Sequence, residues 1–319
     1  MSRRRQDPYA VTRPSVTFPD GPLSPELPVD LPAGCRWGLA LSHDIDHLSL
    51  AEHVADGQLV RIVGNALRKH LGRGFAPSRA LRAAGQGLAV LVGRDAWAGS
   101  VEDLLAAERR AGVKSTWFVA VRQGLGIRYT PAAVAPAVRR ILAEGHEVGL
   151  HGQHADDGPR LAAEILELAG LTGRAVGGLR MHYLRLSPAV YDAALRSGLS
   201  YDSTVMDRSH LDPGRLPLAG PRLVRPGLVE IPLHVMDSTL FSATGLAFDE
   251  RQAVDYVRRL VERAREEGRV LVVNLHPNFY SRFTPEARGW YDALLALATA
   301  RSDVFLTTLE GLRPRIAVP

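Results

Sequence analysis

The sequence predicts an α/β fold in which a parallel sheet of seven or eight strands curls into a distorted (β/α) barrel. Apolar runs of strand length alternate with amphipathic segments of helix length along most of the 319 residues. Glycines stand at several junctions between a predicted helix and the next strand. Because eight candidate strands can be counted, a barrel is favoured over an open sheet.

The predicted elements follow one another in a regular order. The strands are 37–41, 114–121, 147–150, 176–179, 199–203, 228–233, 270–275 and 304–307. The helices are 101–110, 132–143, 160–168, 189–196, 250–267 and 286–300. The glycines that suit the left-handed position at a helix end are Gly112, Gly145, Gly198 and Gly268. Helix starts are indicated by Ser187-Pro188 and Thr284-Pro285.

Two segments do not follow this alternation. Residues 1–35 are rich in proline and lack periodicity, so we expect an N-terminal arm in front of a barrel domain of residues 36–319. Residues 48–99 are basic, moderately apolar and helical in pattern, and we expect a helical insertion that covers the functional site. Packing against the barrel is favoured, and contact of this amphipathic segment with a membrane surface is the alternative.

Composition narrows the partners and the location. The net charge is +5, but the arginines are interleaved with acidic residues. The sequence has no dense basic run with aromatic partners, so nucleic-acid binding is not indicated. Cys35 is the only cysteine, which excludes an internal disulfide and a cysteine-based zinc site. The sequence has neither an apolar run of about 18 residues nor a signal-peptide core. The expected location is the cytoplasm.

Residues that can bind metals or transfer protons follow the predicted strands at their carboxyl ends. Along the chain these residues are Asp44, Asp46, His151, His154, Arg180, His182, Tyr183, Asp202, His234, Asp237 and His276. The carboxyl ends of the strands meet on one face of a parallel barrel, where active sites are built. We therefore expect these side chains to form a single site.

One carboxylate and two imidazoles predict a metal site. Asp46, His151 and His154 form a ligand set that suits zinc or another first-row divalent ion. Three protein ligands leave coordination positions open for water and substrate, which is typical of catalytic rather than structural sites.

The remaining polar residues suggest a division of roles in amide hydrolysis. Asp44 is the expected general base that takes a proton from metal-bound water, with Arg180 holding it ionised. His276 is the expected general acid toward the leaving amine, and Asp202 is its expected orienting partner.

Five segments, in this order, resemble the motifs of the polysaccharide deacetylases with a NodB homology domain, which are similar to carbohydrate esterase family 4. They are Asp44-Ile45-Asp46, the run from Gly145 to His151, Arg180-Met181-His182-Tyr183, Asp202-Ser203-Thr204 and Leu275-His276. The resemblance covers roughly residues 36–312. It implies a distorted (β/α) barrel, a divalent metal, and the same roles for the metal ligands, the base and the acid.

Three features depart from the pattern of that family. One residue separates Asp44 from Asp46, where many members carry adjacent aspartates. His154 follows His151 by three positions instead of the usual four. His182 replaces the usual proline, so it is an alternative third ligand or a substrate contact.

The resemblance implies a hydrolase that removes an N-acyl group, acetyl or formyl, from an amino sugar or a sugar-containing precursor. Zn²⁺ is the expected ion, and Co²⁺, Mn²⁺ and Ni²⁺ are also suitable. The residues expected to contact the substrate are Tyr183, His182, His234 and Asp237. Two alternatives remain open: a catalytically silent homologue that binds metal or carbohydrate, and a hydrolase of a non-sugar amide.

Overall fold

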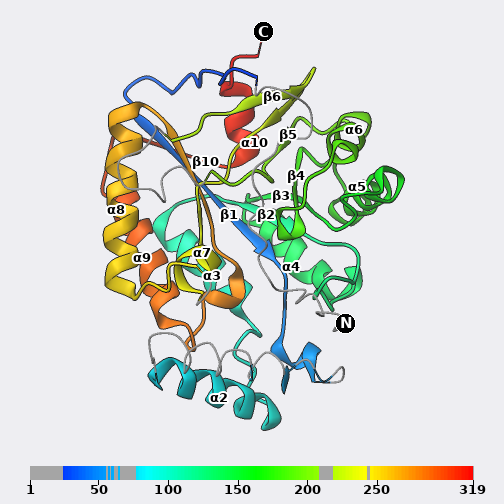
Figure 1. Cartoon of the computed structure of the whole chain (residues 1–319), viewed down its shortest axis with the longest axis vertical. Helices are drawn as coiled ribbons and strands as arrows, with labels where there is room; N and C mark the ends of the chain where they lie inside the picture. Colours follow the sequence, from blue (N-terminus) through cyan, green and yellow to red (C-terminus); the bar gives the residue numbers. More distant parts are fainter. Residues whose placement is uncertain are drawn as a thin grey trace, which may run out of the picture.

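A curled, mostly parallel sheet forms the centre of the protein (Figure 1). The computed structural model describes residues 24–54, 57, 59–60, 64, 77–207, 218–242 and 245–318. The strands are β1 (Trp37–Ile45), β2 (Thr116–Val119), β3 (Glu147–Gly152), β4 (Gly178–Met181), β5 (Tyr201–Asp202), β6 (Arg222–Arg225), β7 (Leu228–Glu230), β8 (Val235–Met236), β9 (Val270–Asn274) and β10 (Val304–Thr307).

The sheet has the order β6-β7-β5-β4-β3-β2-β1-β9-β8, and β10 also pairs with β1. Only β6 and β7 run antiparallel among these paired strands. Within the described part of the chain no ladder joins β8 to β6 or β7, so the barrel is open on that side. The predicted distorted barrel is confirmed, with ten strands in place of seven or eight. The additional strands are β6, which has arginine at both ends, and β8, which has only two residues.

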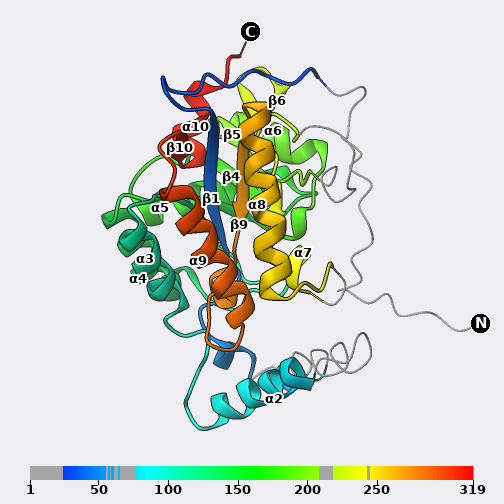
Figure 2. The same cartoon turned by 90° about the vertical axis from the view of Figure 1, so that its left-hand side faces the viewer.

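Helices pack around the outside of the sheet (Figures 1 and 2). The longer ones are α2 (Pro77–Leu91), α3 (Ser100–Ala111), α4 (Pro131–Ala143), α5 (Gly158–Thr172), α6 (Pro188–Arg196), α8 (Glu250–Glu267) and α9 (Pro285–Thr299). The short ones are η1 (Leu50–His53), η2 (His182–Leu184), α7 (Asp237–Phe241), η4 (Pro277–Phe279), α10 (Leu309–Leu312) and η5 (Arg313–Arg315). The six helices predicted between the strands correspond to α3, α4, α5, α6, α8 and α9.

Strand β1 is the axis of the core. All nine of its residues are buried. β9 and β10 pair with its first half and β2 with its second half. A parallel strand that is covered on both faces is expected to be apolar along its whole length. Polar residues at its carboxyl end, Ser42, His43 and Asp44, are therefore costly to bury unless other groups pair with them.

The described part of the predicted arm lies against the barrel. Glu26 forms an isolated β-bridge with Arg222, and Val29 forms one with Ile316 near the C-terminus. Residues 1–23 of the predicted arm lie outside the described residues.

The predicted insertion after the first strand contains helices in its described part. It contains η1 and α2. The helix α2 lies outside the barrel, at the end toward which β1 points (Figures 1 and 2). Arg82 of α2 forms an ion pair with Glu286 of α9, which ties the insertion to the barrel. Among the residues that the structure describes, no helix has the length and apolar character needed to cross a membrane.

Candidate active site

Five of the predicted site residues come together at the carboxyl ends of four strands. Asp44 is in β1 and Asp46 directly follows that strand. His151 belongs to β3 and Arg180 to β4, and His276 comes two residues after β9. The parallel direction of these strands brings the five side chains to one end of the barrel.

Asp44 is held by donors from two other strands. The Arg180 Nη1 donates to Asp44 Oδ1 at 3.0 Å, and Asn274 Nδ2 donates to Asp44 Oδ2 at 3.1 Å. Arg180 is completely buried, and its guanidinium lies over the Phe118 ring, 4.5 Å from the centroid. Burial alone would raise the pKa of Asp44, but the charges of Arg180, His151 and His276 together outweigh it and lower this pKa below its usual value.

Asn274 is a functional position that we did not predict from the sequence. It ends the apolar strand β9 and is completely buried. Besides Asp44, it contacts Arg180, whose Nη1 donates to Asn274 Oδ1 at 2.9 Å. A buried amide requires hydrogen-bond partners. An asparagine at the end of an apolar run was therefore the sequence signal that could have revealed this position.

Asp46 faces two imidazoles. Its Oδ1 lies 3.1 Å from His151 Nε2 and 3.3 Å from His182 Nδ1. These two nitrogens are only 3.0 Å apart. One carboxylate oxygen and two ring nitrogens therefore converge on one point, as ligands of a single ion would.

The outer nitrogens of the two imidazoles explain why a cation fits this cluster. His151 Nδ1 lies 3.1 Å from the carbonyl oxygen of Arg180, and His182 Nε2 lies 3.1 Å from that of Leu125. Carbonyl oxygens only accept, so each outer nitrogen carries a proton, and in a neutral ring the inner nitrogen then presents a lone pair. Two facing lone pairs cannot hydrogen-bond to each other, whereas a metal ion satisfies both.

The charge of Asp46 acts on the same cluster. Burial would raise the pKa of Asp46, but His182 and His151 hold it well below its usual value. Burial lowers the pKa of His182, and Asp46 outweighs this effect and raises it overall. A proton and a metal ion therefore compete for the same His182 nitrogen.

A left-handed turn places His182 in the cluster. Tyr183 and Leu184 have φ values of +57° and +52°, which are costly for residues other than glycine. The Tyr183 hydroxyl donates to the Leu125 carbonyl at 2.8 Å, and the Tyr183 ring lies 4.0 Å from that of His182. Tyr183 is 49% exposed. It is therefore accessible to a substrate at the rim of the site.

The predicted ligand His154 does not join Asp46 and His151. Its Nδ1 is hydrogen-bonded to the carboxylate of Glu164 in α5. Glu164 is completely buried and also accepts from the backbone N–H of Gln153 at 2.9 Å. β3 ends at Gly152, so the three-residue interval places His154 in the following loop, where Glu164 engages it. His182, the alternative ligand, takes the third place in the cluster.

His276 is oriented by Asp237. Its Nδ1 lies 2.7 Å from Asp237 Oδ1, and its backbone amide donates to Asp237 Oδ2 at 2.6 Å. The other ring nitrogen, Nε2, lies 3.6 Å from Asp46 Oδ2 and 4.0 Å from Asp44 Oδ2. Burial would lower the pKa of His276, but Asp237 and the other two carboxylates raise it to about 10.

The prediction that Asp202 orients His276 is wrong. Asp202 Oδ1 accepts from the Thr204 hydroxyl at 2.6 Å, and its neighbouring carboxylate is Glu230. The strand order gives the reason, because β8, which precedes Asp237, pairs directly with β9, whereas β5 lies between β4 and β7. Asp237, which we predicted as a substrate contact, is completely buried, and both of its carboxylate oxygens are bonded to His276.

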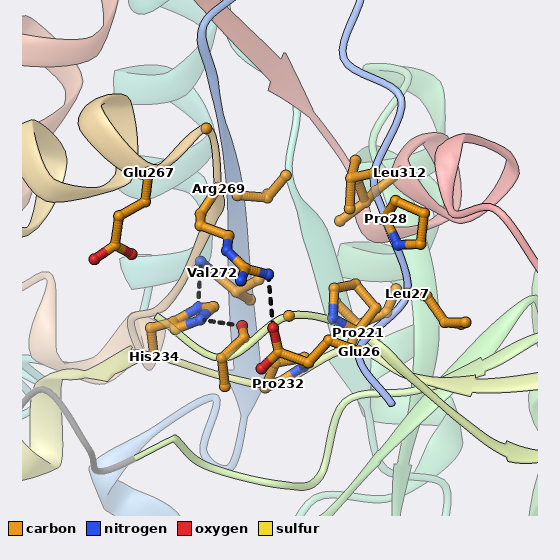
Figure 3. Close-up of a pocket in the computed structure, with 16 residues that line it drawn as sticks. Glu26, Leu27, Pro28, Pro221, Pro232, His234, Glu267, Arg269, Val272 and Leu312 are labelled. Carbon is orange, nitrogen blue, oxygen red and sulfur yellow. Dashed lines mark hydrogen bonds and ion pairs between the residues drawn. The ribbon is translucent and has the colours of Figure 1, made fainter. Parts of the chain in front are cut away.

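His234 does not line the candidate site either. It borders a separate cavity of about 400 Å³ near the beginning of β9, beside the ion pair of Glu26 and Arg269 (Figure 3). Its Nδ1 accepts from the Val272 amide at 3.0 Å, and its Nε2 lies 3.0 Å from the Ala219 carbonyl. His276 follows the opposite end of β9, so the predicted contact of His234 with the substrate is not supported by this position.

Comparisons with known proteins identify the fold. No protein-family model and no curated protein matches the sequence. Among solved structures, a candidate polysaccharide deacetylase from Mycobacterium smegmatis is similar, with 22% identity, a TM-score of 0.64, and coverage of 92% of this chain and 95% of that chain. A candidate polysaccharide deacetylase from Pseudomonas aeruginosa PAO1 has 18% identity and a TM-score of 0.58, with 90% and 93% coverage. The Puue allantoinase has 16% identity and the same TM-score and coverage.

Identities of this size indicate a shared architecture. The similarity extends over nearly the whole length of both chains, so it concerns the complete barrel rather than one supersecondary unit. The chain therefore has the fold of the NodB-type polysaccharide deacetylases, as the sequence motifs predict.

Proposed function

We propose that the protein is a metal-dependent amidohydrolase that removes an N-acyl group, acetyl or formyl, from an amino sugar or a sugar-containing precursor. The convergence of Asp46, His151 and His182 carries this proposal, since the lone pairs of both imidazoles face one carboxylate oxygen. A fixed carboxylate, Asp44, and an oriented imidazole, His276, stand beside that cluster. The shared fold supports a carbohydrate substrate.

Asp46, His151 and His182 would hold the divalent ion. Zn²⁺ suits this set of nitrogen and oxygen donors best, and Co²⁺, Mn²⁺ and Ni²⁺ also fit it. A divalent ion bound there would make a water molecule more acidic and would polarise the acyl carbonyl group.

Asp44 is the proposed base. Arg180 and Asn274 each occupy one of its oxygens, so the carboxylate stays ionised and cannot rotate freely. It takes the proton from the attacking water, whose oxygen forms the new bond to the acyl carbon. Arg180 does not touch the substrate and acts as a positioning residue.

His276 is the proposed acid. Asp237 fixes the Nδ1 side of the ring, which leaves Nε2 directed toward Asp44 and Asp46. The raised pKa keeps the ring protonated at neutral pH, so Nε2 can give a proton to the amide nitrogen as the C–N bond breaks. The products are a free carboxylic acid and an amine. Tyr183 is the proposed substrate contact at the rim.

A non-sugar amide is the second candidate substrate. The Puue allantoinase matches the chain with the same TM-score, 0.58, as the candidate deacetylase from P. aeruginosa. The proposed base, acid and ion would act on such an amide by the same steps.

The proposal is tested by measuring acid release from a panel of substrates by the zinc-loaded protein. The panel contains N-acetyl and N-formyl amino sugars, their phosphorylated forms and non-sugar amides, and Asp44→Asn is the matched control. Acetate or formate released by the wild type and not by Asp44→Asn supports the proposal. Turnover of non-sugar amides alone selects the second candidate. A zinc-loaded protein that releases no acid from any compound contradicts hydrolysis and favours a silent homologue.

A further inference from the structure

A second group of potential metal ligands lies outside the catalytic set. His47, Glu52 and His53 each offer a ligand atom, and these atoms all lie within 4.8 Å of one another. His47 Nδ1 and His53 Nε2 are 3.1 Å apart. The Trp97 ring stacks on His47 with its centroid at 4.9 Å, and it meets His53 edge-on at 6.2 Å. Both imidazoles are therefore held in place by packing.

One half-buried carboxylate, that of Asp95, organises the chain around this group. Asp95 accepts a hydrogen bond from the Ser49 hydroxyl at 2.5 Å and from the first two amides of η1 at 3.0 and 2.8 Å. It also accepts from the Trp97 amide at 2.8 Å. These bonds fix the start of η1, the helix that carries Glu52 and His53, next to the residue that stacks on His47. The group is thus preorganised by its surroundings.

A hydrogen bond between the two imidazoles does not satisfy the whole group. Such a bond would pair one nitrogen of His47 with one of His53. Glu52 Oε2 would stay unpaired, because it is buried and has no hydrogen-bond partner among the described residues. Leaving a buried oxygen without a partner is costly. A cation between the three side chains removes that cost and bonds to all three.

We propose that His47, Glu52 and His53 form a second site for a divalent transition-metal ion, with Zn²⁺ as the favoured occupant. Two imidazoles and one carboxylate are the same donor set as in the cluster of Asp46, and they leave at least one coordination position open. His47 directly follows Asp46, so the two ions would bind next to each other at the mouth of the barrel. This site goes beyond the proposed hydrolysis and does not depend on it.

The test counts zinc ions bound per chain, by elemental mass spectrometry after dialysis against buffered Zn²⁺. We expect two ions for the wild type, one for His53→Ala and one for Asp46→Ala. His154→Ala is the matched control, because His154 is an imidazole paired with Glu164 outside both groups, and we expect it to retain two ions. The isosteric variant Glu52→Gln should weaken the second ion by at least the roughly 10- to 100-fold that loss of an outer-shell partner costs.

The outcomes separate this site from the proposed active site. If the wild type binds one ion, and His53→Ala and Glu52→Gln both bind that ion with unchanged affinity, the second site does not exist. One ion that His53→Ala loses and Asp46→Ala keeps supports the second site and contradicts the first. Circular dichroism of each variant verifies folding, and Glu52→Gln provides the answer if His53→Ala does not fold.

Discussion

The two aspartates at the end of β1 are two residues apart and have opposite surroundings. Asp44 is bonded to donors, the guanidinium of Arg180 and the amide of Asn274. Asp46 faces ring nitrogens of His151 and His182 whose protons are on the far sides of the rings. The first region contains its own positive charge. The second needs a cation from solution, and this difference separates a base from a metal ligand.

Arg180→Met should have the largest effect, because it removes the positive charge from the Asp44 region. Asp44 would be left as a buried carboxylate without its cation, so the free energy of unfolding should fall by about 3–5 kcal/mol. Turnover should fall by about 10²–10⁴-fold, since the base is no longer held ionised. Urea unfolding and acid release measure the two quantities.

Arg180→Lys is the matched control for that variant. It keeps the charge but loses the fork that also donates to the Ser203 carbonyl at 2.9 Å and to the Ser203 hydroxyl at 2.9 Å. An intermediate loss of stability is expected. Wild-type stability in Arg180→Met would contradict the view that this region depends on its internal cation.

His182→Ala changes the other region and should mainly affect the metal. Affinity of the Asp46 cluster for Zn²⁺ should fall by about 100-fold or more, because the loss of an outer-shell partner alone costs about 10- to 100-fold. Stability without metal should change less than in Arg180→Met. Competition with a chromophoric chelator measures the affinity. His154→Ala is the control, and loss of the ion in that variant instead of in His182→Ala would restore the ligand predicted from the sequence.

The fold could be predicted because long elements have a clear period. Each of the eight predicted strands and six predicted helices overlaps an element of the structure. β8 has only two residues and lies between His234 and Asp237, so no apolar run of strand length marks it. This short strand decides which aspartate meets His276, since it pairs with β9 and leads into Asp237.

The parallel strands made most of the site predictable, and Asp46 and His276, which follow strands, also join it. Asp44, His151 and Arg180 lie within strands, and the parallel sheet directs them to one end of the barrel. His154 and His182 lie beyond strand ends, where loop conformation decides the direction of a side chain. The left-handed Tyr183 and the buried Glu164 determine that outcome, and neither leaves a signal in the spacing of histidines.

Asp237→Asn refines the comparison by testing a third aspartate whose only proposed task is to position His276. The amide keeps the size of the side chain but removes the charge beside Nδ1. Turnover should fall by about 10- to 100-fold, which is no more than the loss of the general acid itself would cost, and zinc content should stay unchanged. Asp202→Asn is the matched control and should leave turnover within about threefold of the wild type. The reverse ranking of the two variants would restore Asp202 as the orienting residue.

Asp202 and Glu230 serve as a reference for Asp44 and Asp46. They are two buried carboxylates that face each other and not a cation or imidazoles. Burial raises the pKa of Asp202 to about 6, and burial together with the Asp202 charge raises that of Glu230 well above its usual range. The folded pair therefore keeps protons that the unfolded chain releases. As pH rises from about 4 to above 6, the pair makes the wild type progressively less stable.

Glu230→Gln should remove much of that pH dependence, because the neutral amide does not repel ionised Asp202 and can donate to it. Relative to the wild type, its free energy of unfolding should rise by about 1–2 kcal/mol between pH 4.5 and pH 7, as measured by urea unfolding at both values. Asp156→Asn, at an exposed position, removes one charge without burial and should show no such change. An equal difference between Glu230→Gln and the wild type at both pH values would mean that the pair ionises as easily as exposed carboxylates do. A buried carboxylate in this barrel would then need neither Arg180 nor a metal ion to stay charged, and the contrast between Asp44 and Asp46 would lose its physical basis.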